Sequence, residues 1–445
     1  MSTAGSGRTA PAALRGVQLL GAVLLFYLLD GAFGSGGNGT VGGLEVLLAP
    51  VAAAVVVING CGPRPWITRL HWRPTPLQLG ILSLVFFVVF AIEAGETVLA
   101  PRLLGGDQFA TTLCAARDLL QGHDPYQTGE PQCLASLGIS GDAALTPLRA
   151  RPFDPQQYPS QAEILAAEKA DVAQHSSSGF PYLGYPPLSF LTIIPFAGLG
   201  FTAVNLWVAT LCLVTLLIVA RRAGREAIVV TAGVAAGLGW CLKQFGGDPE
   251  ILGACALIIA VAYLDRPLLS GSMLAAACCT NELAWIAVAP YFVVVLRLPG
   301  LRWRLTSFFG VGLCVIGLWT LYDPRFPMEE WRFVTQPVYP VGVLGLFVSM
   351  THYSPLVFDG AFAALYAASL LVAARRQDWS WAVLASSWIL LWVSWRSLMY
   401  YYLPLLWLSP VVALALEREH RRRMVAVPTL ELTPGRDGVI LALQE

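Results

Sequence analysis

Long apolar runs separated by short polar turns make up most of the chain, and one long polar stretch, 101–185, interrupts them. Runs of about 18 or more apolar residues are typical of helices that span a membrane. The pattern therefore predicts an all-α integral membrane protein, a polytopic bundle of about 10–12 transmembrane helices. The predicted spans are 17–33, 43–59, 78–100, 186–199, 201–220, 227–242, 249–264, 268–296, 305–322, 355–374, 380–394 and 397–416, with 341–351 as a short re-entrant or interfacial segment.

Arginine positions predict the orientation, because cytoplasmic loops carry an excess of Lys and Arg. Twelve crossings place both chain ends in the cytoplasm and 101–185 outside, but they leave the arginines at 221–225 on the outer side. An alternative topology makes 186–199 re-entrant and divides 268–296 into two half-helices around Asn281-Glu282, which leaves ten crossings. Both topologies keep the long polar stretch on the outer face.

The predicted organisation is one transmembrane domain, 1–416, followed by a charged cytoplasmic tail, 417–445. The 101–185 stretch is the first large extracytoplasmic loop of that domain. Within it, the segment 108–121 has apolar residues at helical spacing, which predicts an amphipathic helix on the membrane surface. The chain is therefore expected to be a multi-pass protein of the plasma membrane.

Composition excludes several other classes of protein. Only 13% of the residues are charged and the net charge is zero, against about 25% charged residues in soluble domains. No basic segment suits nucleic acid, and no spacing of Cys and His predicts a metal site. Cys114 and Cys133 share the polar loop, where they can form a disulfide if the loop is extracytoplasmic. The sequence leaves that pairing open.

Asp107 is the first candidate for chemistry, because it follows Gly105-Gly106 at the outer end of the third predicted span. The simpler interpretation is a solvated loop carboxylate or a helix cap. Two rigid motifs follow it: Gly-His-Asp-Pro-Tyr, which ends at Tyr126, and Tyr-Pro-Pro-Leu, which begins at Tyr185. The two ends of the loop are expected to be held together, with Tyr126 and Tyr185 positioning the loop or a substrate.

The order of these motifs resembles the polytopic GT-C glycosyltransferases, and among them the bacterial mannosyltransferases that use polyprenyl-phosphate sugars. The resemblance covers 107–195, and elsewhere only hydropathy and topology agree. In that family, the aspartate of the first outer loop is the general base, so the resemblance implies this role for Asp107. A hydroxyl group is a weak nucleophile, and a positioned base accelerates its attack by about 10²–10⁴-fold.

The function implied is an inverting transfer of a hexose, with mannose as the first guess. The donor is a polyprenyl-phosphate sugar, the acceptor is a glycan or glycolipid, and the active site lies on the outer face of the membrane. No metal and no cofactor besides this donor substrate is expected. The expected partners are therefore the lipid-linked donor, the acceptor and the membrane itself, without nucleic acid.

The departing polyprenyl phosphate needs cationic or hydrogen-bonding groups to stabilise its charge. His352, Arg396 and Lys243 are the candidates for a donor-phosphate site, the first two on predicted outer segments that flank spans. The side of the membrane that holds Lys243 depends on the topology. The alternative for each is an interfacial anchor, because long cationic side chains extend to the headgroups.

Glu93 and Glu282 are further candidates, because ionisable groups within a span are costly and are often functional. Glu93 lies near the outer end of the third predicted span and either lines the same cavity as Asp107 or sits among headgroups. Glu282 follows Asn281, where related enzymes often carry a lysine, and this departure weakens the resemblance there. The alternative functions are a secondary transporter or an envelope-assembly scaffold, and the small number of intramembrane charges argues against a transporter.

Overall fold

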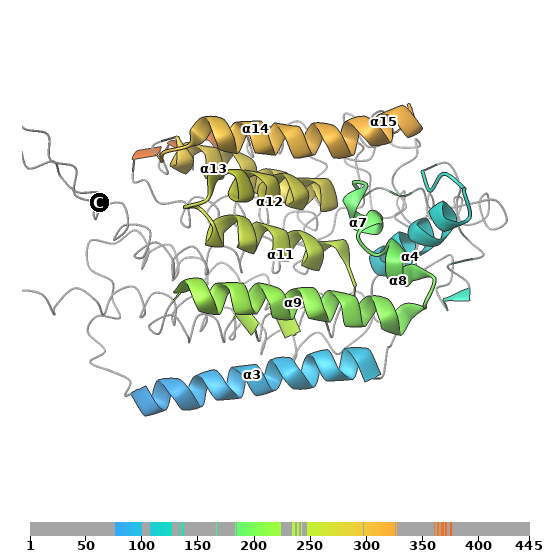
Figure 1. Ribbon diagram of the computed structural model, residues 1–445, viewed down its shortest axis with the longest axis horizontal. Helices are drawn as coiled ribbons and strands as arrows, with labels where there is room; N and C mark the ends of the chain where they lie inside the picture. The colour runs from blue at the N-terminus through green and yellow to red at the C-terminus, as the bar shows by residue number, and fades with distance from the viewer. Residues whose placement is uncertain are drawn as a thin grey trace, which may run out of the picture.

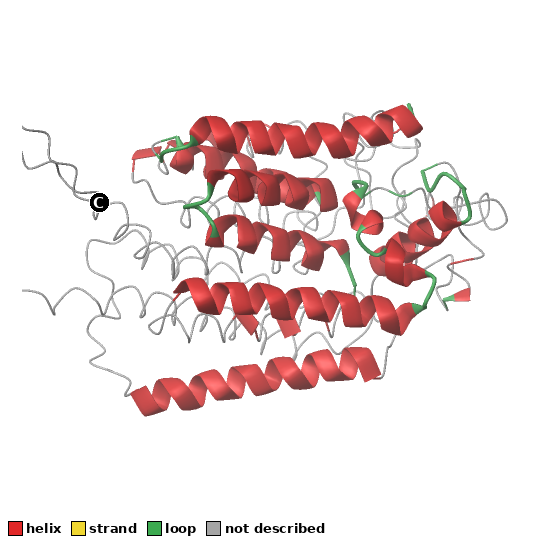
Figure 2. Cartoon of the chain, in the orientation of Figure 1, coloured by secondary structure: helices red, strands yellow, loops and turns green. Residues whose placement is uncertain are grey.

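The computed structural model describes residues 76–99, 107–126, 183–223 and 247–326, with single gaps at 184, 297 and 325, together with isolated positions at 133–137, 166, 234–242 and 360–375. Throughout this described part the chain is helical, and no strand occurs in it (Figure 2). The all-α prediction is confirmed for these residues. Lys243, His352 and Arg396 lie outside them, as do the predicted spans 17–33, 43–59, 380–394 and 397–416.

The long helices lie side by side as a bundle, and the helices α4, α7 and α8 gather at one end of it (Figure 1). In chain order the helices are α3 (Pro76–Leu99), α4 (Asp107–Leu120), α7 (Leu188–Leu191), α8 (Ile194–Ala197), α9 (Phe201–Ala223), α11 (Pro249–Ala262), α12 (Pro267–Thr280), a 3₁₀ helix (Glu282–Ala287), α13 (Val288–Val295), α14 (Leu301–Gly312) and α15 (Leu318–Tyr322).

Helices α3 and α9 run antiparallel. The Asn205 side-chain amide donates a hydrogen bond to the carbonyl oxygen of Thr97 (3.4 Å), which joins the last turn of α3 to the first turns of α9. The ring of Phe109 in α4 lies 4.7 Å from the ring of Phe201, the first residue of α9. We call this end of the bundle the α4 end (Figure 1).

The opposite end, here called the far end, is marked by the ion pair between Arg222 and Asp265 (3.0 Å). Arg222 belongs to the last turn of α9, and Asp265 follows α11. The arginines that close α9 are therefore at the opposite end of the bundle from α4. The ten-crossing alternative expects this arrangement if the helices cross a membrane, because it puts the 221–225 cluster in the cytoplasm.

The span predicted for 186–199 is wrong. This segment forms two four-residue helices, α7 and α8, separated by a turn, and each is about 6 Å long. Pro186, Pro187 and Pro195 lack the backbone N–H groups that a continuous helix needs. The segment therefore stays at the α4 end, where α7 and α8 contact α4.

The long apolar run predicted as one span, 268–296, is also divided. It leaves the far end as α12, breaks at Asn281, and returns as the 3₁₀ helix and α13. The Asn281 backbone is extended, with φ −150° and ψ 133°, and its side chain accepts a hydrogen bond from the backbone N–H of Leu283 (2.8 Å). The break therefore has a local cause, and the ten-crossing alternative placed it at this residue.

Close packing at the far end holds this hairpin to its neighbours. The side chain of Arg304 in α14 is buried and bonds the Tyr291 hydroxyl (3.3 Å) and the carbonyl oxygen of Leu264. The Tyr291 hydroxyl also lies 2.6 Å from the hydroxyl of Ser270 in α12. Arg304 thus joins α14 to α13 and to the end of α11, and the Tyr291 hydroxyl extends this connection to α12. Arg304 also satisfies a carbonyl group just beyond the end of α11.

Within the described part of the chain, two helices are long and apolar enough to cross a membrane by length and composition: Phe201–Arg222 and the continuous helix Leu301–Tyr322. A five-residue π turn, Leu313–Gly317, joins α14 to α15 within the second of them. Large apolar side chains on three helices are exposed, which suits contact with lipid. They include Leu77, Ile81, Leu84, Val85, Val88 and Ile92 of α3, Leu206, Leu213 and Leu217 of α9, and Phe309, Leu313 and Leu321 of α14, the π turn and α15.

Candidate functional site

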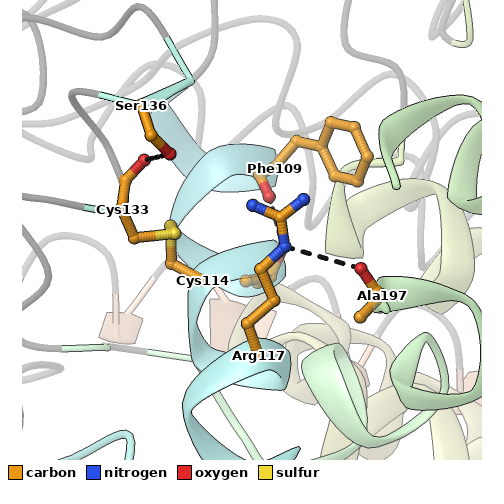
Figure 3. Close-up of a disulfide and its surroundings, with 7 residues drawn as sticks. Phe109, Cys114, Arg117, Cys133, Ser136 and Ala197 are labelled. Atoms are coloured by element: carbon orange, nitrogen blue, oxygen red, sulfur yellow. Dashed lines mark hydrogen bonds between the residues drawn. A yellow bond between two sulfur atoms is a disulfide. The ribbon is translucent and has the colours of Figure 1, made fainter. Parts of the chain in front are cut away.

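Helix α4 begins at Asp107 and is attached to its surroundings at three points. Cys114 and Cys133 form a disulfide, with their Cα atoms 5.9 Å apart (Figure 3). The Arg117 guanidinium donates through Nε to the carbonyl oxygen of Ala197 at the end of α8 (3.4 Å; Figure 3). The Phe109 ring packs on α9, as described above. The predicted helix at 108–121 is therefore confirmed, and it is an anchored element.

The turn that follows α4 is equally fixed. The Tyr126 hydroxyl donates to the carbonyl oxygen of Tyr185 (2.5 Å), and the Tyr126 backbone N–H donates to the Asp124 carboxylate (3.0 Å). The Tyr126 ring packs on Phe190 and Trp319, with centroids 5.9 and 5.7 Å away. Tyr126 and Tyr185 are both buried, so the structure gives them an architectural role: they join the turn after α4 to the segment that enters α7.

Asp107 occupies the first position of α4. Since α4 is anchored, the backbone of Asp107 is held at the α4 end of the bundle, next to the beginnings of α9 and α11. Gly247, two residues before α11, packs so closely on the Phe109 ring that a Cβ atom there would overlap it. The stretch that enters α11 therefore lies against the first turn of α4.

Buried polar side chains gather around this point. Asp248 and Glu250, at the start of α11, are 1% and 3% exposed, and Gln108 in the first turn of α4 is 4% exposed. Ser189 of α7 and Asn281, between α12 and the 3₁₀ helix, are also buried. Helix α7 contacts α4, α11 and α12, and the 3₁₀ helix contacts α11. All five residues therefore lie at the α4 end of the bundle.

The predicted acidic candidates have different surroundings. Glu282 opens the 3₁₀ helix and is partly buried, next to Asn281 at the α4 end. Glu93 is buried inside the bundle, where its Cβ faces Gly239, and it is not a headgroup residue. Its neighbour in sequence, Glu96, is exposed. The structure thus brings Glu282 towards the α4 and α11 elements and places Glu93 within the helix packing.

The predicted donor-phosphate residues His352, Arg396 and Lys243 stay predictions, because they lie outside the described residues. Among the residues that the structure does describe, no group of three or more His, Cys, Asp or Glu side chains is placed to hold a metal ion. The described part of the candidate site consists of carboxylates, amides and a hydroxyl.

Asp248, Glu250 and Ser189 are additions that the sequence-based reasoning did not single out. The signal for the first two is the acidic sequence Asp-Pro-Glu at the start of an apolar run, since ionisable groups are rare in such runs. Ser189 has no comparable signal, because a serine in an apolar helix is common. Its burial follows from the contacts of α7 with three other helices.

The chain matches no protein-family model, no curated protein and no solved structure.

Proposed function

We propose that this protein is a polytopic membrane glycosyltransferase of the GT-C type that transfers a hexose, mannose as the first candidate, from a polyprenyl-phosphate donor to a glycan or glycolipid acceptor. Its site would be the α4 end of the bundle, on the outer face of the plasma membrane. The observation that carries the proposal is the anchored position of Asp107 at the first residue of α4, next to the buried polar side chains that begin α11.

In the proposed reaction, Asp107 is the general base. Its carboxylate takes the proton of an acceptor hydroxyl while that oxygen forms a bond to the anomeric carbon of the donor. The bond from the anomeric carbon to the phosphate oxygen breaks with its electron pair, so polyprenyl phosphate leaves and the configuration inverts. The base must be held within hydrogen-bond reach of the hydroxyl. The disulfide and the Arg117–Ala197 hydrogen bond support such a fixed placement.

Two features support the outer location of the α4 end. A disulfide at Cys114–Cys133 suits an oxidising compartment outside the cytoplasm. Arg221 and Arg222 lie in the last turn of α9, at the far end, where the excess of positive charge is expected in the cytoplasm. The exposed apolar faces of α3, α9 and α14 support a lipid environment between the two ends.

The test is transfer by the purified full-length protein in lipid nanodiscs, with radiolabelled polyprenyl-phosphate mannose and a membrane-derived acceptor fraction. Asp107→Asn keeps the side-chain shape and removes the proton acceptor, so transfer is expected to fall by about 10²–10⁴-fold. Asp118→Asn, a substitution on the same helix, is the matched control and should keep most activity. Full activity of the Asp107→Asn variant would overturn the proposal.

A secondary transporter is the second candidate, and the burial of carboxylates inside the bundle favours it. Glu93, Asp248, Glu250 and Asp323 are each less than 8% exposed, and such groups often carry protons or ions in transporters. Proton-coupled uptake of a solute into sealed vesicles, lost on Glu250→Gln, would favour this function over transfer.

A further inference from the structure

The α4 end contains buried polar atoms that no protein group satisfies. The Ser189 hydroxyl, the Gln108 side-chain oxygen Oε1 and the Asn281 amide nitrogen Nδ2 each lack a hydrogen-bond partner, although their residues are only 1%, 4% and 0% exposed. A buried polar group without a partner is destabilising, because it has lost its hydrogen bonds to water and gained none in the protein. Such groups are rare in native structures and call for an explanation, such as a ligand that occupies the site.

These residues come from elements that meet. Gln108 lies in the first turn of α4, Ser189 in α7, and Asn281 at the end of α12, and α7 contacts both other helices. Trp319 adds a fourth unsatisfied group, its indole N–H, and its ring lies 5.2 Å from that of Phe190, the residue after Ser189. These four unsatisfied atoms thus lie at the same end of the bundle.

The chemistry of these atoms selects a class of ligand. The Asn281 amide and the Trp319 indole offer donors, Gln108 offers an acceptor, and Ser189 offers both. A ligand rich in neutral hydroxyl groups can satisfy donors and acceptors together, whereas a phosphate is bound best by cationic groups, and all four of these side chains are neutral.

We propose that Ser189, Gln108, Asn281 and Trp319 form a subsite that binds the hydroxyl groups of a hexose ring, and that the sugar-phosphate group is bound elsewhere. This inference rests on the proposed function for the identity of the sugar as a substrate. It goes further because it assigns the binding of the hexose ring to α7 and its neighbouring helices. It also places the sugar-phosphate group outside this subsite. Ser189 and Gln108 then determine which hexose is bound.

The test measures hexose binding without transfer, by saturation-transfer NMR on the full-length protein in lipid nanodiscs. The probes are methyl α-mannopyranoside, methyl α-glucopyranoside and inorganic phosphate. Ser189→Ala should raise the Kd of the preferred hexoside by about threefold to tenfold, the effect of one lost hydrogen bond. It should leave the melting temperature unchanged or higher, because it deletes a hydroxyl that has no protein partner.

Ser270→Ala is the matched control at the far end. The Ser270 hydroxyl bonds the carbonyl oxygen of Ala260 (2.7 Å) and the Tyr291 hydroxyl, so this variant should lose thermal stability and keep hexoside binding. Gln108→Met provides a second variant of similar volume and should also weaken binding. Ser189→Ala, at the α4 end, should therefore weaken hexoside binding and keep thermal stability. Ser270→Ala, at the far end, should keep binding and lose stability.

The proposal is overturned if the folded wild-type protein binds neither hexoside, if Ser189→Ala and Gln108→Met both bind as the wild type does, or if inorganic phosphate displaces the hexoside. Its failure is distinguishable from failure of the proposed function. Hexoside binding that depends on Ser189, combined with full activity of Asp107→Asn, would keep the subsite and remove the proposed general base.

Discussion

The hydroxyl group of Tyr126 donates a 2.5 Å hydrogen bond to the backbone carbonyl oxygen of Tyr185, 59 residues later in the chain. This bond joins the turn after α4 to the segment that enters α7. Both residues are buried, and Phe190 and Trp319 pack on the Tyr126 ring. The hydrogen bond therefore holds the two ends of the segment 126–185 together.

Tyr126→Phe should destabilise the protein by about 1–3 kcal/mol, because the buried Tyr185 carbonyl loses its donor while the ring contacts remain. The measurement is thermal unfolding of the full-length protein in nanodiscs. Tyr322→Phe, at an exposed tyrosine, is the control and should leave the melting temperature unchanged. Equal melting temperatures for Tyr126→Phe and the wild type would contradict an architectural role for this hydroxyl.

Reduction of Cys114–Cys133 should lower the stability of the wild type by about 3 kcal/mol, the loop-closure value for a cross-link of this separation. A thermal scan with and without dithiothreitol measures the effect. The double variant Cys114→Ser, Cys133→Ser should melt at the same temperature in both conditions. If maleimide labels both cysteines of unreduced, denatured wild type, the disulfide is absent.

Tyr291→Phe should cost about 1.5–3 kcal/mol, more than a neutral hydrogen bond, because the bond from the buried Arg304 is charge-assisted. Chemical or thermal unfolding gives the value. Tyr263→Phe is a suitable control, since the Tyr263 ring stacks under Arg222 (4.1 Å) and the phenylalanine ring keeps that contact. A Tyr291 effect no larger than the control would mean that Arg304 does not depend on this hydroxyl.

Cysteine labelling should show that the two ends of α9 and its neighbours lie on opposite sides of the membrane. Gln121→Cys, at an exposed position after α4, should react with a membrane-impermeant maleimide added to intact cells. Arg221→Cys, at an exposed position of the far end, should react only after permeabilisation. Labelling of both positions from outside would contradict the proposed orientation.

Local patterns predicted the helices whose boundaries depend on nearby residues. The 3.6-residue spacing in 108–121 anticipated α4, and the apolar runs 201–220 and 305–322 anticipated α9 and the helix Leu301–Tyr322. Mean hydropathy predicted a span at 186–199 that the structure does not contain. It takes no account of the three prolines in this segment, which lack the backbone N–H groups needed for helical hydrogen bonds.

The candidate site was predicted only in part. Tyr126 and Tyr185 were expected from their motifs to position the loop or a substrate, and in the structure the Tyr126 hydroxyl bonds the Tyr185 carbonyl oxygen. The burial of Ser189 and Glu250 arises from contacts between α7, α11 and α4, segments far apart in sequence. Single-sequence patterns hold no information on such contacts, so Ser189 could be found only from the packing, whereas Glu250 has a signal in the acidic Asp-Pro-Glu motif.

The π turn at Leu313–Gly317 changes which residues of one long helix share a side. Arg304 and Asp323 are both 1% exposed. Along an unbroken α-helix a separation of nineteen residues leaves two side chains roughly 100° out of phase. A single extra residue in a π turn shifts the phase by about the same angle in the opposite sense. The π turn therefore keeps Arg304, Trp319 and Asp323 on the same side of the helix, and deletion of one residue in Leu313–Gly317 would rotate Trp319 and Asp323 away from that side.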